Sequence, residues 1–125
     1  MRVLLAFEQQ YRAYREALRD AIRMFHSGVE VVVADSADLE AEVERWAPQL
    51  VILDHRAPEN PVDAQPSRIE LSPEPDQSSR FRVGERRWES MNPTLGEILP
   101  VIDETRRLLR TTQQQAPTDA GEAEV

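Results

Sequence analysis

The feature that most constrains the fold is a change of hydrophobic period that occurs repeatedly within the first 54 residues. Short apolar runs at 3–7, 29–34 and 50–53 have the length and composition of buried strands. Between them, apolar residues recur every three or four positions, over 11–25 and again over 39–46, as they do on one face of a helix. This strand–helix alternation predicts right-handed crossovers and a parallel sheet covered by helices.

The pattern changes after Asp54. Three prolines between residues 55 and 67 exclude a regular helix there, so a fourth parallel strand would lack its usual crossover. Two alternating segments follow, at 68–72 and 81–88, and Gly84-Glu85 fits a two-residue turn. We therefore expect residues 68–90 to add antiparallel hairpin structure to the parallel sheet.

The last third of the chain predicts one helix and a tail. Asn92-Pro93 is typical of a helix start, and the apolar period that follows predicts a helix over 93–110, kinked at Pro100. Residues 111–125 have no apolar period and predict a disordered tail. The chain is thus expected to form one α/β domain over 1–110, followed by that tail.

Composition excludes several classes of function. The 15 basic and 23 acidic residues give a net charge of −8, which argues against a nucleic-acid partner. Every basic residue is arginine, and the absence of cysteine excludes disulfides, thiolate nucleophiles and cysteine metal sites. No apolar run approaches the roughly 20 residues of a membrane span, so we expect a cytoplasmic protein without a membrane partner.

Polar residues at strand ends form the candidate site. Glu8, Asp54 and Ser72 each follow a predicted strand, and ligands of such sheets bind at the carboxyl ends of the strands. Glu8 and Asp54 could hold Mg²⁺ through their oxygens, and a small enzyme using this crevice is a further alternative. Each residue also has a simpler explanation. Asp54 could be a strand-end carboxylate that accepts loop amides, Glu8 an acid favoured at a helix start, and Ser72 a turn residue. We do not expect a zinc site at His55, because such a site needs three or four ligands. The chain has one other histidine, His26, which lies at the far end of the first predicted helix.

Three segments, VLLAFE, YREAL and PQLVILDHRAP, resemble the receiver domain of two-component response regulators. That family has a flavodoxin-like fold, an acidic pair after strand one, and a phosphorylated aspartate after strand three with a proline four residues later. Asp54 and Pro58 match this spacing, Glu8 matches the second acid, and Ser72 could match the small hydroxyl residue after strand four. The resemblance implies a three-layer flavodoxin-like βαβαβ core, Asp54 as phosphoacceptor, Mg²⁺ on Glu8 and Asp54, and Ser72 as a phosphate contact.

The resemblance covers residues 1–58 and, through NPTLGEILPVIDETRRLL, residues 92–110, but the middle of the chain departs from it. Phe7 stands where the family has its first acid, and the chain has no lysine to hold the phosphoryl oxygens. Arg86 or Arg87 could approach that place, but a planar guanidinium is a poor replacement for an ammonium group. We therefore expect a degenerate, non-enzymatic receiver-like protein that acts through protein interaction, without a cofactor. The alternative is a working receiver with Mg²⁺.

The segment RFRVGERRWES suggests where such an interaction occurs. It alternates charged and large apolar residues, and tryptophan and arginine are enriched in interface hot spots. Trp88, Arg86 and Phe81 are therefore the candidate interface residues, for a protein partner or for a second copy in a homodimer. The alternative is an ordinary solvated hairpin face.

Overall fold

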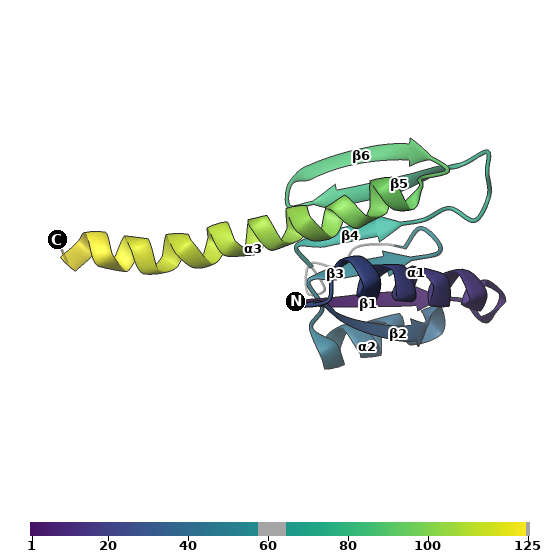
Figure 1. The fold of residues 1–125 in the computed structure, drawn as a ribbon, viewed down its shortest axis with the longest axis horizontal. Coiled ribbons are helices and arrows are strands. Elements are labelled where there is room, and N and C mark those ends of the chain that lie inside the picture. Colours follow the sequence, from purple (N-terminus) through teal and green to yellow (C-terminus); the bar gives the residue numbers. More distant parts are fainter. Residues whose placement is uncertain (58–64, 125) are drawn as a thin grey trace.

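The computed structural model describes residues 1–57 and 65–124, with side chains through Thr111. Figure 1 shows an α/β domain with one sheet and three helices. The strands are β1 (Arg2–Phe7), β2 (Glu30–Asp35), β3 (Leu50–Leu53), β4 (Ser67–Glu70), β5 (Ser78–Val83) and β6 (Arg86–Met91). The helices are α1 (Arg12–Phe25), α2 (Leu39–Trp46) and α3 (Leu95–Glu124), and single 3₁₀ turns at Gln9–Tyr11 and Ser36–Asp38 precede the first two.

The six strands form one sheet in the order β2-β1-β3-β4-β5-β6. β2, β1, β3 and β4 are parallel, which is the strand order of flavodoxin-like parallel cores. β5 and β6 are added antiparallel, and Val83 and Arg86 close the turn between them. This confirms the predicted fold class, a parallel βαβαβ start followed by an antiparallel hairpin and a C-terminal helix.

One detail of the prediction needs correction. β4 is parallel to β3 and antiparallel only to β5, although the prolines between residues 55 and 67 had suggested that no parallel strand follows Asp54. The connection from 54 to 66 is long enough to reach a parallel neighbour of β3, because extended chain covers about 3.3 Å per residue. Pro58 and Pro61 lie outside the described residues.

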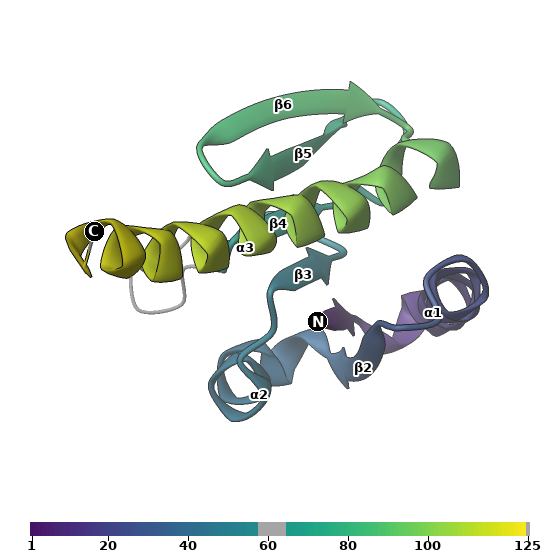
Figure 2. The ribbon, with the colours of Figure 1, turned by 60° about the vertical axis from the view of Figure 1, so that its left-hand side comes forward.

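Two apolar clusters pack on opposite faces of the sheet. One face is covered by α1 and α3, and the other, over β2, β1 and β3, by α2 (Figure 2). The first cluster contains Leu18 and Ile22 of α1 and Ile98, Val101 and Ile102 of α3. The second is smaller and contains Leu4, Ala6, Val51 and Leu53, packed against Leu39 and Val43 of α2.

The face that α2 covers becomes charged from β4 outwards. Val51 and Leu53 face α2, and their register partners in β4 are Arg68 and Glu70. Facing side chains in β5 and β6 continue this charged surface with Arg80, Arg82, Arg87 and Glu89. Among the described residues no helix packs on this part of the sheet.

The start of α3 differs from the prediction. The helix begins at Leu95, and Glu97 reaches back to accept the Thr94 N–H at 2.9 Å, as in half of a capping box. Thr94 is therefore the capping residue, whereas Asn92 lies two residues earlier with a left-handed φ of 45°. Pro100 lies inside the helix, as expected.

α3 continues to Glu124, and its C-terminal half extends past the sheet (Figure 1). The division of the chain at residue 110 into a domain and a tail stays a prediction. None of the described helices combines the length and the apolar character that a bilayer span requires.

Candidate functional site

Asp54 connects the carboxyl ends of β1 and β3, the middle two of the four parallel strands. β1 and β3 are parallel neighbours, so Glu8 and Asp54 follow them at the same edge of the sheet. Asp54 is only 4% exposed, and its Oδ2 accepts the backbone N–H of Glu8 at 2.7 Å. Its Oδ1 lies 2.7 Å from Nδ1 of His55. Both oxygens of this carboxylate therefore have partners within the chain.

Glu8 and Ser72 lie near Asp54 but use their side chains locally. The Glu8 carboxylate is exposed, and its Oε2 accepts a hydrogen bond from the side-chain amide of Gln10 at 2.7 Å. Ser72, two residues beyond β4, donates to the carbonyl of Glu74 and accepts its N–H, both at 3.2 Å. These contacts are typical of a residue before a 3₁₀ turn and of a turn serine.

The three predicted residues line one open pocket of about 270 Å³ at the carboxyl edge. The structure thus brings Glu8, Asp54 and Ser72 together as the sequence suggested. Within residues 1–57 and 65–124, no three histidine, aspartate or glutamate side chains are placed to hold one metal ion. Magnesium on Glu8 and Asp54 stays a prediction, and it would have to compete with the hydrogen bonds of Asp54.

An adjacent pocket of about 310 Å³ is more apolar and opens between the start of α1 and the loop after β4. Phe7, at the position where receivers have an acid, is buried and stacks on Tyr14 with the ring centroids 5.9 Å apart. Burial raises the pKa of the Tyr14 hydroxyl above its ordinary value, because burial disfavours the charged phenolate. The apolar character of Phe7 therefore serves packing at this edge.

Arg86 and Arg87 do not approach Asp54, which corrects the suggestion that one of them could reach the place of the missing lysine. β5 runs antiparallel to β4, so the turn between β5 and β6 lies at the amino ends of the parallel strands. Asp54 follows β3 at the opposite edge. Arg86 instead forms an ion pair with Glu104 of α3.

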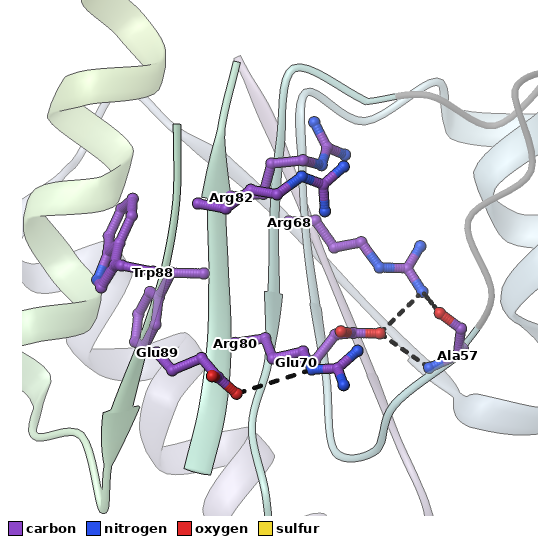
Figure 3. Close-up of a pocket in the computed structure, with 9 residues that line it drawn as sticks. Ala57, Arg68, Glu70, Arg80, Arg82, Trp88 and Glu89 are labelled. Carbon is purple, nitrogen blue, oxygen red and sulfur yellow. Dashed lines mark hydrogen bonds and ion pairs between the residues drawn. The ribbon is translucent and has the colours of Figure 1, made fainter. Parts of the chain in front are cut away.

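A second candidate site is the charged surface of β4, β5 and β6, which contains a cavity of about 570 Å³ (Figure 3). Arg68 donates to the carbonyl of Ala57 at 2.9 Å, and Glu70 accepts the Ala57 N–H at 2.8 Å. The two side chains lie 3.4 Å apart and are 6% and 9% exposed. This pair holds the backbone that leaves β3. The Arg68–Glu70 pair was not predicted from the sequence, although the charged residues at alternate positions of RIE indicate that both side chains share one face.

Trp88 and Phe81 lie on the other face of the hairpin, toward α3. Figure 3 shows Trp88 on the side of α3, with Arg82 and Arg68 on the opposite side of the sheet. The Trp88 ring stacks on Phe81 with centroids 5.2 Å apart, and the Arg86 guanidinium lies 4.4 Å above the Trp88 ring. Phe81 is 2% exposed, so it belongs to the core and not to an accessible surface. Trp88 is half-buried and Arg86 is exposed.

No protein-family model matches the chain, and neither a curated protein nor a solved structure is significantly similar to it.

Proposed function

We propose that the protein is a receiver-like interaction module that works without phosphorylation. The observation that carries this proposal is the bonding of Asp54. A phosphoacceptor needs an accessible carboxylate oxygen, whereas Asp54 is buried and both of its oxygens have hydrogen-bond partners in the chain. Its role in this proposal is to join the ends of β1 and β3.

The resemblance to receivers supports the fold part of the proposal. The parallel order β2-β1-β3-β4 is compatible with a flavodoxin-like core, and Asp54 ends its central strand. The chain lacks the lysine of the receiver site, and the Arg86–Arg87 pair lies at the far edge of the sheet. Arg56 lines the pocket of Asp54, but its guanidinium contacts Ser78 and Glu89. A similar fold alone does not imply an activity, so we infer the function from the residues of the site.

The hairpin supports the interaction part. β6 is the outermost strand of the sheet, and exposed edge strands recruit further strands unless they are covered. It carries Trp88 and Arg86, whose residue types are enriched in interface hot spots. In this proposal the carboxyl edge serves stability, and β6 serves recognition.

The test is incubation with acetyl phosphate and Mg²⁺, followed by intact-mass measurement. We expect no phosphoryl group to be added. A gain of one phosphoryl group that disappears in Asp54→Asn would overturn the proposal in favour of a working receiver. A gain that persists in Asp54→Asn leaves the proposal standing, because another side chain then accepts the phosphoryl group.

A magnesium titration followed by NMR gives an independent readout. The amide of Glu8 donates to Asp54, so its resonance reports any ion that takes over the carboxylate. We expect this resonance to stay in place as MgCl₂ is added, with the exposed amide of Glu85 as a reference for general salt effects. A saturating shift at Glu8 alone contradicts the proposal.

A further inference from the structure

The edge strand β6 is self-complementary, and its charge pattern selects one register. Resting on the proposed function, we infer that the partner is a second copy of this chain. Its β6 pairs antiparallel with the first across a two-fold axis at Trp88, so that two six-stranded sheets become one continuous sheet.

The turn before β6 determines which backbone groups face outward. Gly84 and Glu85 are its two central residues, and Gly84 has a φ of +59° while Glu85 has no positive φ, as in a type II′ hairpin turn. In such a turn the N–H of Arg86 points back to the carbonyl of Val83. The backbone groups of Arg86 therefore face β5.

The direction of backbone groups alternates along an antiparallel strand. The N–H and C=O groups of Trp88 and Ser90 consequently face β5, as do those of Arg86. The groups of Arg87, Glu89 and Met91 face the open edge of the sheet. A further strand must form its hydrogen bonds with these outward-facing residues.

The charges of the outward-facing residues distinguish the possible two-fold axes. An axis at Arg87 places two arginines directly opposite each other, and an axis at Glu89 places two glutamates opposite each other. An axis at Trp88 places Arg87 opposite the partner's Glu89, and it does so twice in each dimer. Opposite charges in register stabilise a pair of strands and like charges destabilise it, so the Trp88 axis is favoured. Axes nearer either end leave half or more of the six-residue strand unpaired.

The side chains on both faces are compatible with this register. Ser78 at 2.7 Å, Arg56 at 3.5 Å and Arg80 at 3.9 Å all contact Oε1 of Glu89. The other oxygen, Oε2, is the atom that can accept from the partner's Arg87. At the axis the two Trp88 residues form a non-hydrogen-bonded pair, the type in which side chains lie closest. Aromatic pairs in such positions add to the stability of the pairing.

The test is sedimentation velocity of the full chain, from low micromolar to several hundred micromolar, with charge-reversal variants. We expect the wild type to dimerise with rising concentration. Arg87→Glu opposes glutamates at both pairs and Glu89→Arg opposes arginines, so each variant alone is expected to weaken the dimer about tenfold or more. An equimolar mixture of the two variants restores two complementary pairs and is expected to dimerise as the wild type does.

The controls keep the inference falsifiable. Arg87→Glu places a glutamate opposite Arg82 in the same sheet, so it retains a folded monomer, which circular dichroism verifies. If Glu89→Arg fails to fold for loss of its contacts to Arg56 and Arg80, the Arg87→Glu result alone decides. Glu85→Arg reverses a charge on the same hairpin outside the Arg87–Glu89 pairs and leaves the dimer intact.

A monomeric wild type, or an Arg87→Glu variant that dimerises as the wild type does, overturns the inference. When circular dichroism shows both variants to be folded, a mixture of the two that stays monomeric also overturns it, because the dimer then uses another register or another surface. None of these outcomes bears on phosphorylation of Asp54, so failure of the dimer and failure of the proposed function are distinguishable.

Discussion

The parallel half of the sheet, β2-β1-β3-β4, and the antiparallel half, β5-β6, differ in how their strands are buried. All four residues of β3 are buried, because α2 packs on one face of that strand and the α1–α3 side on the other. In β5 the buried Phe81 alternates with the charged Arg80 and Arg82, because α3 covers one face only. Continuous apolar strands thus belong to the doubly covered part of the sheet, and alternating strands to the part with an open face.

In the proposed function, the parallel half provides stability and the antiparallel half provides recognition. Removing buried atoms from the parallel half creates a cavity, whereas the exposed charged side chains of β5 and β6 are expected to tolerate substitution in the folded monomer. Variants on the same face of neighbouring strands can therefore test where the apolar cluster under α2 ends.

The largest effect is expected for Leu53→Ala in β3. Leu53 is fully buried against α2, and such truncations cost about 2–5 kcal/mol in the free energy of unfolding. Arg80→Ala lies on the same face two strands away, is 51% exposed at its side chain, and is expected to change stability by less than about 0.5 kcal/mol. Urea denaturation measures both. Equal losses would contradict the division of the sheet.

A smaller loss is expected for Glu70→Ala, where the two halves meet. The substitution removes the acceptor of the Ala57 N–H and an ion partner of the buried Arg68, at a cost of about 1–3 kcal/mol. Glu74→Ala, an exposed glutamate in the next loop, is the matched control and is expected to be nearly neutral. If the two variants have the same urea midpoint, Glu70 does not hold the strand connection.

Gly84→Ala is expected to cost about 1–2 kcal/mol, because an alanine at a φ of +59° is strained. Gly96→Ala in the first turn of α3 has no such strain and an ordinary contact of 3.5 Å to Thr94, so it should gain up to about 1 kcal/mol. Thermal unfolding of the two variants gives opposite shifts in Tm. A neutral Gly84→Ala variant would argue against the type II′ turn that defines which groups of β6 face outward.

The smallest effect is expected for Tyr14, which lines the pocket of about 310 Å³ between α1 and the loop after β4. Its pKa is raised in the folded state by burial, so ionisation favours unfolding, and the stabilising contribution of the neutral phenol is lost as the pH rises through the folded pKa. An alkaline absorbance titration of the wild type minus that of Tyr14→Phe should give a midpoint above 10.0. A midpoint at or below that value would mean that the hydroxyl is fully hydrated.

Much of the parallel half could be predicted because its signals are local. The runs 3–7 and 50–53 are apolar at every position, and the segments between them change to a helical period. The meeting of Glu8 and Asp54 followed directly, since parallel neighbours end at the same edge. The hydrogen bond between them was among the alternatives, because a strand-end carboxylate commonly accepts loop amides.

The antiparallel half was harder to predict because its arrangement depends on long-range pairing. Alternation placed Phe81 and Trp88 in one hairpin, but only the position of α3 determines that Phe81 is buried. The prolines before β4 argued against a helical crossover, yet they did not exclude a parallel strand. The direction of β5, which carries Arg87 away from Asp54, is a property of the whole sheet and of no single segment.

The sheet has two outer strands, and β2 differs from β6 in a way that limits growth. β2 has an acid at each end, so an antiparallel approach of two β2 strands brings Glu30 of one copy near Asp35 of the other. The ion pair of Glu30 with Arg2, at 3.0 Å, reduces this repulsion in part. In the dimer that we infer, both outer strands are β2, and this approach of like charges would disfavour a further pairing of β2 with β2.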